Sequence, residues 1–158
     1  MRGRVVTPVH REWRRGDLVI STDPARLDVA MIHEFLARRS YWAQEIPPEL
    51  VRRSIEHALC FGLHAPEGQV GFARVVTDYA VFAYLGDVFV LESHRGRGLG
   101  AWLVETVLAC PELQGLRRWD LATLDAHELY RRFGFREADA ARMMERVDPA
   151  PEIYRRGR

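Results

Sequence analysis

The sequence predicts an α/β fold, in which a central mixed β-sheet is covered by helices on both faces. Two kinds of segment alternate along the chain: runs rich in β-branched and aromatic residues, and runs whose apolar residues recur at helical spacing. Their order is β-α-α-β-β-β-α-β-α-β. With no repeat or low-complexity linker, residues 1–158 are expected to form a single domain, with a core at about 17–147 and loosely held ends.

The first half of the chain contains one strand and two helices. "DLVIST" (17–22) is typical of a short strand. A helix is expected to follow, with Asp23 as N-cap and Pro24 in its first turn, and to run to about Arg38. Two prolines then interrupt the helical pattern, and a second helix is expected over about 48–58.

Strands dominate the middle of the chain. "CFGLHA" (60–65) and "QVGFARVV" (69–76) are separated by a turn and predict a hairpin, and "VFAYLGDVFVL" (81–91) predicts a third strand. A helix over about 98–109 follows. Its buried stripe is expected to consist of Leu99, Trp102, Leu103, Thr106 and Val107.

The last part of the chain is expected to add a strand, a short helix and a final strand. "RWDLATL" (118–124) predicts the first of these strands. Asp125 and Glu128 are spaced as in a capping box at the start of the helix, and Gly134 suits a left-handed cap at its end. "ARMMERV" (141–147) predicts the last strand.

Composition argues against several classes of partner. The 23 basic residues, all arginines, face 22 acidic ones, so the net charge of +1 gives no reason to expect nucleic-acid binding. The longest apolar stretch, 79–91, is interrupted by Gly86 and Asp87 and is too short to span a membrane. Without a signal-peptide pattern, the protein is expected to be cytoplasmic.

The two cysteines are expected to be buried reduced thiols. Cys60 and Cys110 lie in apolar surroundings, and neither has histidine or cysteine neighbours at zinc-ligand spacing. No metal site is therefore predicted.

The stretch "FVLESHRGRGLGAWLVETVL" (89–108) places a glycine-rich turn between a strand and a helix. The first amides of a helix have no internal partner and lie at the positive end of its dipole, so they favour an anion. Glycines without Cβ atoms allow phosphate oxygens to approach the backbone closely, and arginines add charged donors. These residues are Arg95, Gly96, Arg97, Gly98 and Gly100. The turn therefore predicts a phosphate or pyrophosphate site.

Two nucleotide-binding motifs fit the glycines less well. A Walker loop needs a lysine, and the chain has none. A dinucleotide-binding loop needs G-x-G-x-x-G, whereas the spacing from Gly96 is G-x-G-x-G, which disfavours a nucleotide-binding oxidoreductase fragment. A tight turn without a ligand stays open as an alternative.

At these residues the sequence resembles the GCN5-related N-acetyltransferase (GNAT) superfamily. The family motif, Arg/Gln-x-x-Gly-x-Gly/Ala, is matched by Arg95-Gly96-Arg97-Gly98-Leu99-Gly100. The resemblance extends upstream to "GDVFVLESH" and downstream to "LYRRFGF", and covers about 17–147. Over the first 60 residues it lies mainly in the order of elements.

The resemblance implies a GNAT-like fold and acetyl-CoA as cosubstrate, bound in a cleft where two neighbouring parallel strands splay apart. Backbone groups of Val88, Phe89 and Val90 would pair with the pantetheine arm. The pyrophosphate would lie on the amides of residues 95–100. The family and the local chemistry thus point to the same turn.

Acetyl transfer to an amine requires a neutral amine and a protonated leaving thiolate. The resemblance places Tyr130 where a hydroxyl can reach the CoA sulfur as proton donor; otherwise Tyr130 is an aromatic residue of the core. Asp87, within an apolar strand, is the candidate base, or else a structural carboxylate bonded to the backbone or an arginine. Glu92, His94 and His127 are the other titratable groups nearby, although each is expected on a loop or helix surface.

Tyr41 and Trp42 are the candidate acceptor-binding residues, because the family shapes this site from its first two helices and their connecting loop. Aromatic rings with a nearby acid can hold a cationic amine; alternatively the pair covers the core. The expected acceptor is an amine of a small molecule or peptide. A non-catalytic acyl-CoA sensor is the alternative function, and a homodimer is compatible with the family.

Overall fold

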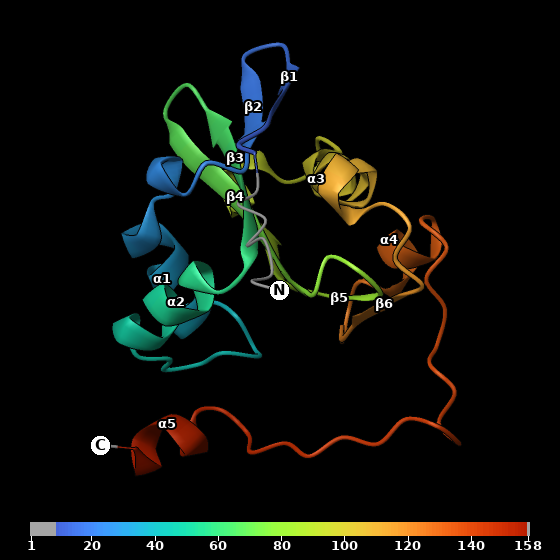
Figure 1. Ribbon diagram of the computed structural model, residues 1–158. Coiled ribbons are helices and arrows are strands. Elements are labelled where there is room, and N and C mark those ends of the chain that lie inside the picture. Colours follow the sequence, from blue (N-terminus) through green and yellow to red (C-terminus); the bar gives the residue numbers. More distant parts are fainter. Residues whose placement is uncertain (1–8, 158) are drawn as a thin grey trace, which may run out of the picture. The chain divides into compact units, whose positions relative to one another are not determined.

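In the computed structural model, residues 9–157 are described, and they contain one six-stranded sheet in the order β1-β2-β3-β4-β5-β6 (Figure 1). The chain divides into two compact units. The sheet unit comprises Met1–Leu27 and Ala58–Asp120, and the helical unit comprises Asp28–His57 and Leu121–Arg158. Residues 1–8 of the predicted N-terminal arm lie outside the described residues.

The sheet begins with a hairpin of β1 (Glu12–Arg15) and β2 (Leu18–Ser21), which are antiparallel. Gly16, with φ 61°, occupies the first central position of the two-residue turn, where a positive φ matches the twist of the strands. The strand over 17–22 was predicted, but β1 was expected to be part of a loose arm. Instead, Trp13 stacks on Phe61 of β3 with ring centroids 6.0 Å apart, which holds β1 in place.

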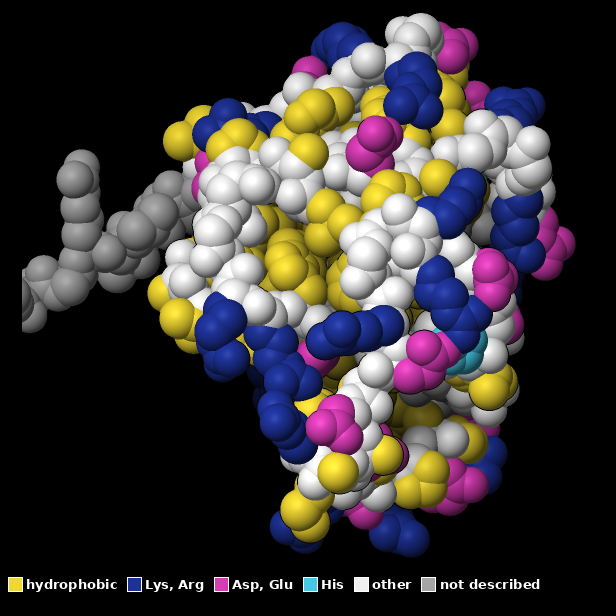
Figure 2. Space-filling view, turned by 90° about the vertical axis from the view of Figure 1, so that its right-hand side faces the viewer, with side chains coloured by type: hydrophobic (Ala, Val, Ile, Leu, Met, Phe, Trp, Pro, Cys, Tyr) yellow, Lys and Arg dark blue, Asp and Glu magenta, His cyan; other side chains and the backbone are white. Residues whose placement is uncertain are grey.

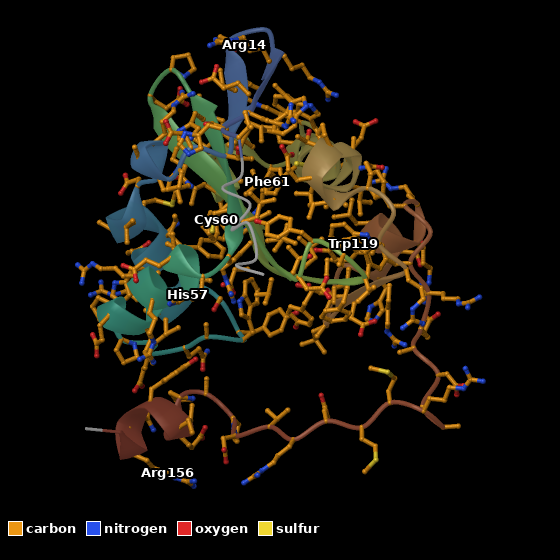
Figure 3. The ribbon with its side chains drawn as sticks, in the orientation of Figure 1. Arg14, His57, Cys60, Phe61, Trp119 and Arg156 are labelled. Atoms are coloured by element: carbon orange, nitrogen blue, oxygen red, sulfur yellow. The ribbon has the colours of Figure 1, made fainter. Side chains whose placement is uncertain are left out.

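The centre of the sheet is an antiparallel meander of β3 (Leu59–Ala65), β4 (Gly68–Thr77) and β5 (Phe82–Val90). The predicted hairpin and third strand are therefore confirmed. Successive residues of a strand point to opposite faces of the sheet, and Cys60 and Phe61 on β3 show this alternation (Figure 3).

The helix α3 (Leu99–Ala109) packs on the sheet against β3, β4 and β5. All five residues of its predicted stripe are buried. Short 3-10 turns flank the helix: η2 (Glu92–His94) before it and η3 (Pro111–Leu113) after it. The chain then enters β6 (Arg118–Leu121), whose first N–H bonds the Val81 carbonyl, at the residue before β5 begins. A helical crossover between neighbouring strands is the connection that a parallel pair requires.

The predicted helix over 24–38 is two helices in the structure. The 3-10 turn η1 (Pro24–Arg26) has the predicted N-cap, with Asp23 accepting from the Ala25 N–H. The second aspartate, Asp28, then accepts from the Met31 N–H and begins α1 (Val29–Arg38). In the helical unit, α1 packs against the predicted second helix, α2 (Pro48–Glu56).

The C-terminal part of the helical unit differs from prediction in two places. The short helix α4 (His127–Arg131) has Ala126 as its N-cap, so the predicted capping box at Asp125 is wrong. The predicted strand over 141–147 is absent from the described structure. The carboxylate and carbonyl of Asp139 accept hydrogen bonds from the N–H groups of residues 141–143, so these N–H groups are not available to pair with a neighbouring strand. This segment is exposed, Met144 almost entirely (97 %), and a further helix, α5 (Glu152–Arg156), follows it.

Both cysteines are free and buried, as predicted. Burial raises the pKa of the Cys60 thiol to about 12, and it raises the pKa of Cys110 to the same level. Each thiol is therefore protonated at neutral pH.

Within residues 9–157, no helix has the length and apolar character needed to cross a membrane. In the same residues, no three His, Cys, Asp or Glu side chains gather as metal ligands. On the face shown in Figure 2, arginine side chains are interspersed with acidic ones, so no continuous basic surface covers it.

Candidate active site

The strand β5 is bent by a β-bulge at Asp87. Phe72 of β4 pairs with Phe89, and Arg74 pairs with Gly86, so β5 has one residue more than β4 between these pairs. Asp87 adopts a φ of 53°, which is uncommon for a residue with a side chain. Bulges re-aim side chains and occur frequently beside active sites.

The Asp87 carboxylate has an arginine partner on the neighbouring strand. The Arg74 Nε donates to Asp87 Oδ2 at 2.7 Å, and both side chains are largely buried, with 20 % and 12 % of their surface exposed. This ion pair meets the need of a carboxylate within an apolar strand for a partner. The role of Asp87 as base stays a prediction.

The residues after the bulge form the end of β5. Phe89 is buried and its ring lies 6.0 Å from that of Phe72, whereas Val88 and Val90 are partly exposed. β5 has nine residues and β6 only four, so β6 cannot cover the whole edge of β5. Because β6 begins beside Val81 and has only four residues, the end of β5 formed by Val88–Val90 extends beyond it.

The glycine-rich turn forms an open cradle at the start of α3. Gly96 and Gly98 have φ angles of 78° and 72°, and Gly98 is the N-cap of the helix. A Cβ atom on either of them, or on Gly100, would meet no atom within 4 Å. The Trp102 N–H donates to the Gly98 carbonyl and makes the first i to i−4 hydrogen bond of the helix. The N–H groups of residues 99–101 therefore have no acceptor within the helix. This geometry fits an anion such as a pyrophosphate.

The arginines of the turn are exposed, and one of them is already oriented. The Arg95 Nε donates to the Val90 carbonyl at 3.0 Å, which places its guanidinium at the end of β5. Between β5 and the turn, His94 is buried rather than on the surface as expected from the sequence. It pairs with Glu67 of the β3–β4 turn, a residue that the sequence did not single out.

In the helical unit, a glycine cap holds Tyr130 of α4. The Phe135 N–H bonds the Tyr130 carbonyl and the Gly134 N–H bonds the Arg131 carbonyl, which is the Schellman arrangement. Gly134 has a φ of 87°, which confirms the predicted left-handed cap. The cap brings the Phe135 ring edge-on to Tyr130, with centroids 5.8 Å apart.

The Tyr130 side chain is suited to act as a neutral donor. Burial, helped by the nearby Tyr41 and Asp125, raises the pKa of its phenol to about 12. The hydroxyl forms no hydrogen bond with any side chain or backbone group of residues 9–157. It is protonated at neutral pH and can donate to a ligand.

Tyr41 and Trp42 lie in the loop between α1 and α2, and their rings meet edge to face at 4.9 Å. The side chains are 44 % and 37 % exposed, so they do not simply cover the core. The Tyr41 hydroxyl also accepts from the Leu124 N–H at 2.7 Å, in the segment before α4. The predicted acceptor loop is thereby bonded to the segment that leads to Tyr130.

Two further contacts hold the same loop. The His33 ring of α1 bonds the Ile46 carbonyl at 3.0 Å. Arg155 of α5 donates to the Glu45 carboxylate at 2.9 Å through Nε, and again through its terminal nitrogen. The structure thus brings together Tyr41, Trp42 and Tyr130 in the helical unit. It brings together Asp87, Val88–Val90 and the cradle in the sheet unit.

Residues 56–137 match the sequence profile of the acetyltransferase (GNAT) domain. A protein of Gibberella zeae named as a candidate acetyltransferase is 33 % identical over 142 residues, which are 76 % of this chain and 79 % of that protein.

Solved structures show the same likeness. A Xanthomonas campestris protein, described as a candidate acetyltransferase of the GNAT family, has a TM-score of 0.82 and 52 % identity, over 85 % of this chain and 95 % of that one. A GNAT family acetyltransferase from Elizabethkingia anophelis, solved with acetyl-CoA bound, has a TM-score of 0.60 and 16 % identity, over 79 % and 80 % of the chains. The predicted fold class is confirmed, and the chain belongs to the GNAT family of acetyltransferases.

Proposed function

We propose that the protein transfers the acetyl group of acetyl-CoA directly to an amine of a small molecule or peptide. The observation that carries the proposal is the cradle: Gly96, Gly98 and Gly100 leave open space beside the first amides of α3. A pyrophosphate on these amides would gain hydrogen bonds and the favourable end of the helix dipole. Arg95 and Arg97 would add charge-assisted donors.

The end of β5 supports binding of the rest of the cosubstrate. The edge of Val88–Val90 extends beyond the short strand β6, and an amide-containing arm can pair with exposed strand backbone. The Arg95 guanidinium, bonded to the Val90 carbonyl, links this edge to the cradle. Pantetheine on β5 and pyrophosphate on the cradle would therefore be continuous.

The reaction forms a C–N bond between the amine and the thioester carbonyl carbon, and it breaks the C–S bond. The amine must lose a proton, for which we assign Asp87, and the leaving thiolate must gain one, for which we assign Tyr130. The high pKa of Tyr130, about 12, keeps its proton in place until charge develops on sulfur. Tyr41 and Trp42 present exposed ring faces that favour a cationic amine.

The test is binding of acetyl-CoA by calorimetry, with wild type, Gly98→Glu and Gly115→Glu. Gly98 and Gly115 both have positive φ and open space for a Cβ, so the two variants carry equal strain and charge. Gly115 lies after α3, away from the cradle. We expect Gly98→Glu alone to abolish binding, and equal affinity in both variants would reject the cradle.

The same samples then separate an enzyme from a sensor. Thiol release with a panel of small amines and amine-bearing peptides supports acetyl transfer if one class gives turnover. Tight binding without release for any amine would instead favour a non-catalytic acyl-CoA-binding module.

A further inference from the structure

A buried histidine connects the segment before the cradle to a distant turn. The His94 Nε2 lies 2.6 Å from Glu67 Oε1, and His94 Nδ1 lies 2.8 Å from the Ser93 hydroxyl. His94 is only 7 % exposed. The Nε2–H of the ring donates to Glu67, and Nδ1 lies within hydrogen-bond distance of the Ser93 hydroxyl. The ring is therefore held in one orientation.

The connection is placed where the chain leaves the sheet. The Leu91 N–H bonds the Val70 carbonyl of β4 at 2.8 Å. In the turn that follows, the backbone bonds found are local, from His94 to Leu91 and from Arg95 to Glu92. The His94–Glu67 bond ties this turn to the β3–β4 hairpin through side chains.

The charge of the Glu67 carboxylate, taken alone, disfavours phosphate binding at the cradle. A hydrogen bond from its own amide, together with His94 and the Arg97 charge, lowers the pKa of Glu67, so the side chain is ionised at neutral pH. A negative charge near Arg97 opposes the binding of a phosphate there. We therefore expect Glu67 to favour phosphate binding in another way that offsets its charge.

We propose that Glu67 and His94 are positioning residues that hold the Arg95–Gly100 cradle in the geometry that binds the phosphates of acetyl-CoA. The inference rests on the proposed function, because it assigns the cradle to acetyl-CoA. A pre-ordered loop binds more tightly, since less conformational freedom is lost when the ligand binds. Without the pair, the turn from Glu92 to Arg97 would keep only its local bonds and the Arg95–Val90 bond, and the ligand would have to supply more of its order.

The experiment measures acetyl-CoA affinity by calorimetry in Glu67→Ala, Glu67→Gln and Glu92→Ala. Glu67→Ala removes the acceptor of the His94 bond, whereas the amide oxygen of Glu67→Gln keeps it. Glu92→Ala is the matched control for charge: it removes one exposed carboxylate of the same turn that does not contact His94.

We expect Glu67→Ala to weaken acetyl-CoA binding by about tenfold, the loss typical of a hydrogen bond to a charged group. Glu67→Gln should stay within about threefold of wild type, and Glu92→Ala should bind equally or more tightly. At saturating acetyl-CoA, kcat and the KM for the amine should be unchanged in all three variants. This pattern separates positioning from general damage to the fold.

Three outcomes would overturn the inference. The Glu67→Ala variant could bind acetyl-CoA as tightly as the Glu92→Ala variant, which would show that only the loss of charge matters. Glu67→Gln could lose as much as Glu67→Ala, or the amine KM could rise in parallel. If wild type binds acetyl-CoA in these cases, the proposed function stands without the positioning role. If wild type and Gly98→Glu give the same heat signal, the proposed function itself fails.

Discussion

Arg74 and Asp87 form a 2.7 Å ion pair across β4 and β5, at the bulge where the register of the two strands shifts. The pair places a carboxylate just before the strand end that we assign to pantetheine. A carboxylate with an arginine partner can serve both as scaffold and as proton acceptor. The two roles make different predictions.

Replacing Asp87 by Asn is expected to lower kcat by about 100-fold, the lower end of what general-base catalysis contributes. It should also reduce the free energy of unfolding by about 2 kcal/mol, because Arg74 keeps a largely buried charge without its partner. The Asp87→Asn/Arg74→Met variant should regain stability but not activity. If the double variant regains both, Asp87 is only scaffold.

Tyr130→Phe tests the proton donor. The ring and its contact with Phe135 are kept, so acetyl-CoA affinity should stay within about twofold, while kcat falls by about 10- to 100-fold. Tyr84→Phe, which removes the hydroxyl of a tyrosine that is 36 % exposed on β5, is the matched control and should retain wild-type kcat. Parallel losses of affinity and turnover in Tyr130→Phe would assign Tyr130 to the core instead.

The raised pKa of Tyr130 also predicts a loss of stability in alkali. Below pH 10 the phenol is protonated in both the folded and the unfolded state. Between the ordinary value of 10 and the folded value of about 12, the unfolded state ionises first, so stability falls as pH rises. The loss approaches about 2–3 kcal/mol at pH 12. Denaturant unfolding of wild type and Tyr130→Phe over this range should show the difference, and identical slopes would contradict it.

Tyr41→Phe removes the hydroxyl that accepts from the Leu124 N–H and keeps the ring beside Trp42. The loop between α1 and α2 should then be less firmly bonded to the segment before α4. We expect the KM for the amine to rise about fivefold, the value of one hydrogen bond, with acetyl-CoA affinity unchanged. An unchanged amine KM would show that this bond has no part in acceptor binding.

The features predicted correctly are those set by neighbouring residues. The glycine turn before α3 follows from glycines between a strand and an apolar helix, and the Gly134 cap follows from the short helix that it ends. β1 was missed although "RRGDLV" contains a two-residue Gly-Asp turn, a local hairpin signal. The two strands of this hairpin have only four residues each, which is too short for a clear alternation of apolar and polar residues.

The remaining differences between prediction and structure have two causes. Local hydrogen bonds replace strand pairing, and residues distant in the sequence contact one another. The pattern of "ARMMERV" suits a strand, but Asp139 accepts hydrogen bonds from the N–H groups at the start of this segment. The partners of Asp87 and His94 lie on other strands or turns, and a single sequence does not reveal which residues the sheet register brings together. The burial of His94 was missed for the same reason.

The two buried cysteines have a practical consequence for studying this protein. A disulfide reagent that reports free CoA reacts with thiolates, and thiols with a pKa of about 12 are almost wholly protonated at assay pH. The folded chain should contribute little colour of its own, so slow turnover can be measured at high protein concentration. One cysteine introduced on the exposed segment before α5 would then be the preferred attachment point for a fluorophore, without first removing Cys60 or Cys110.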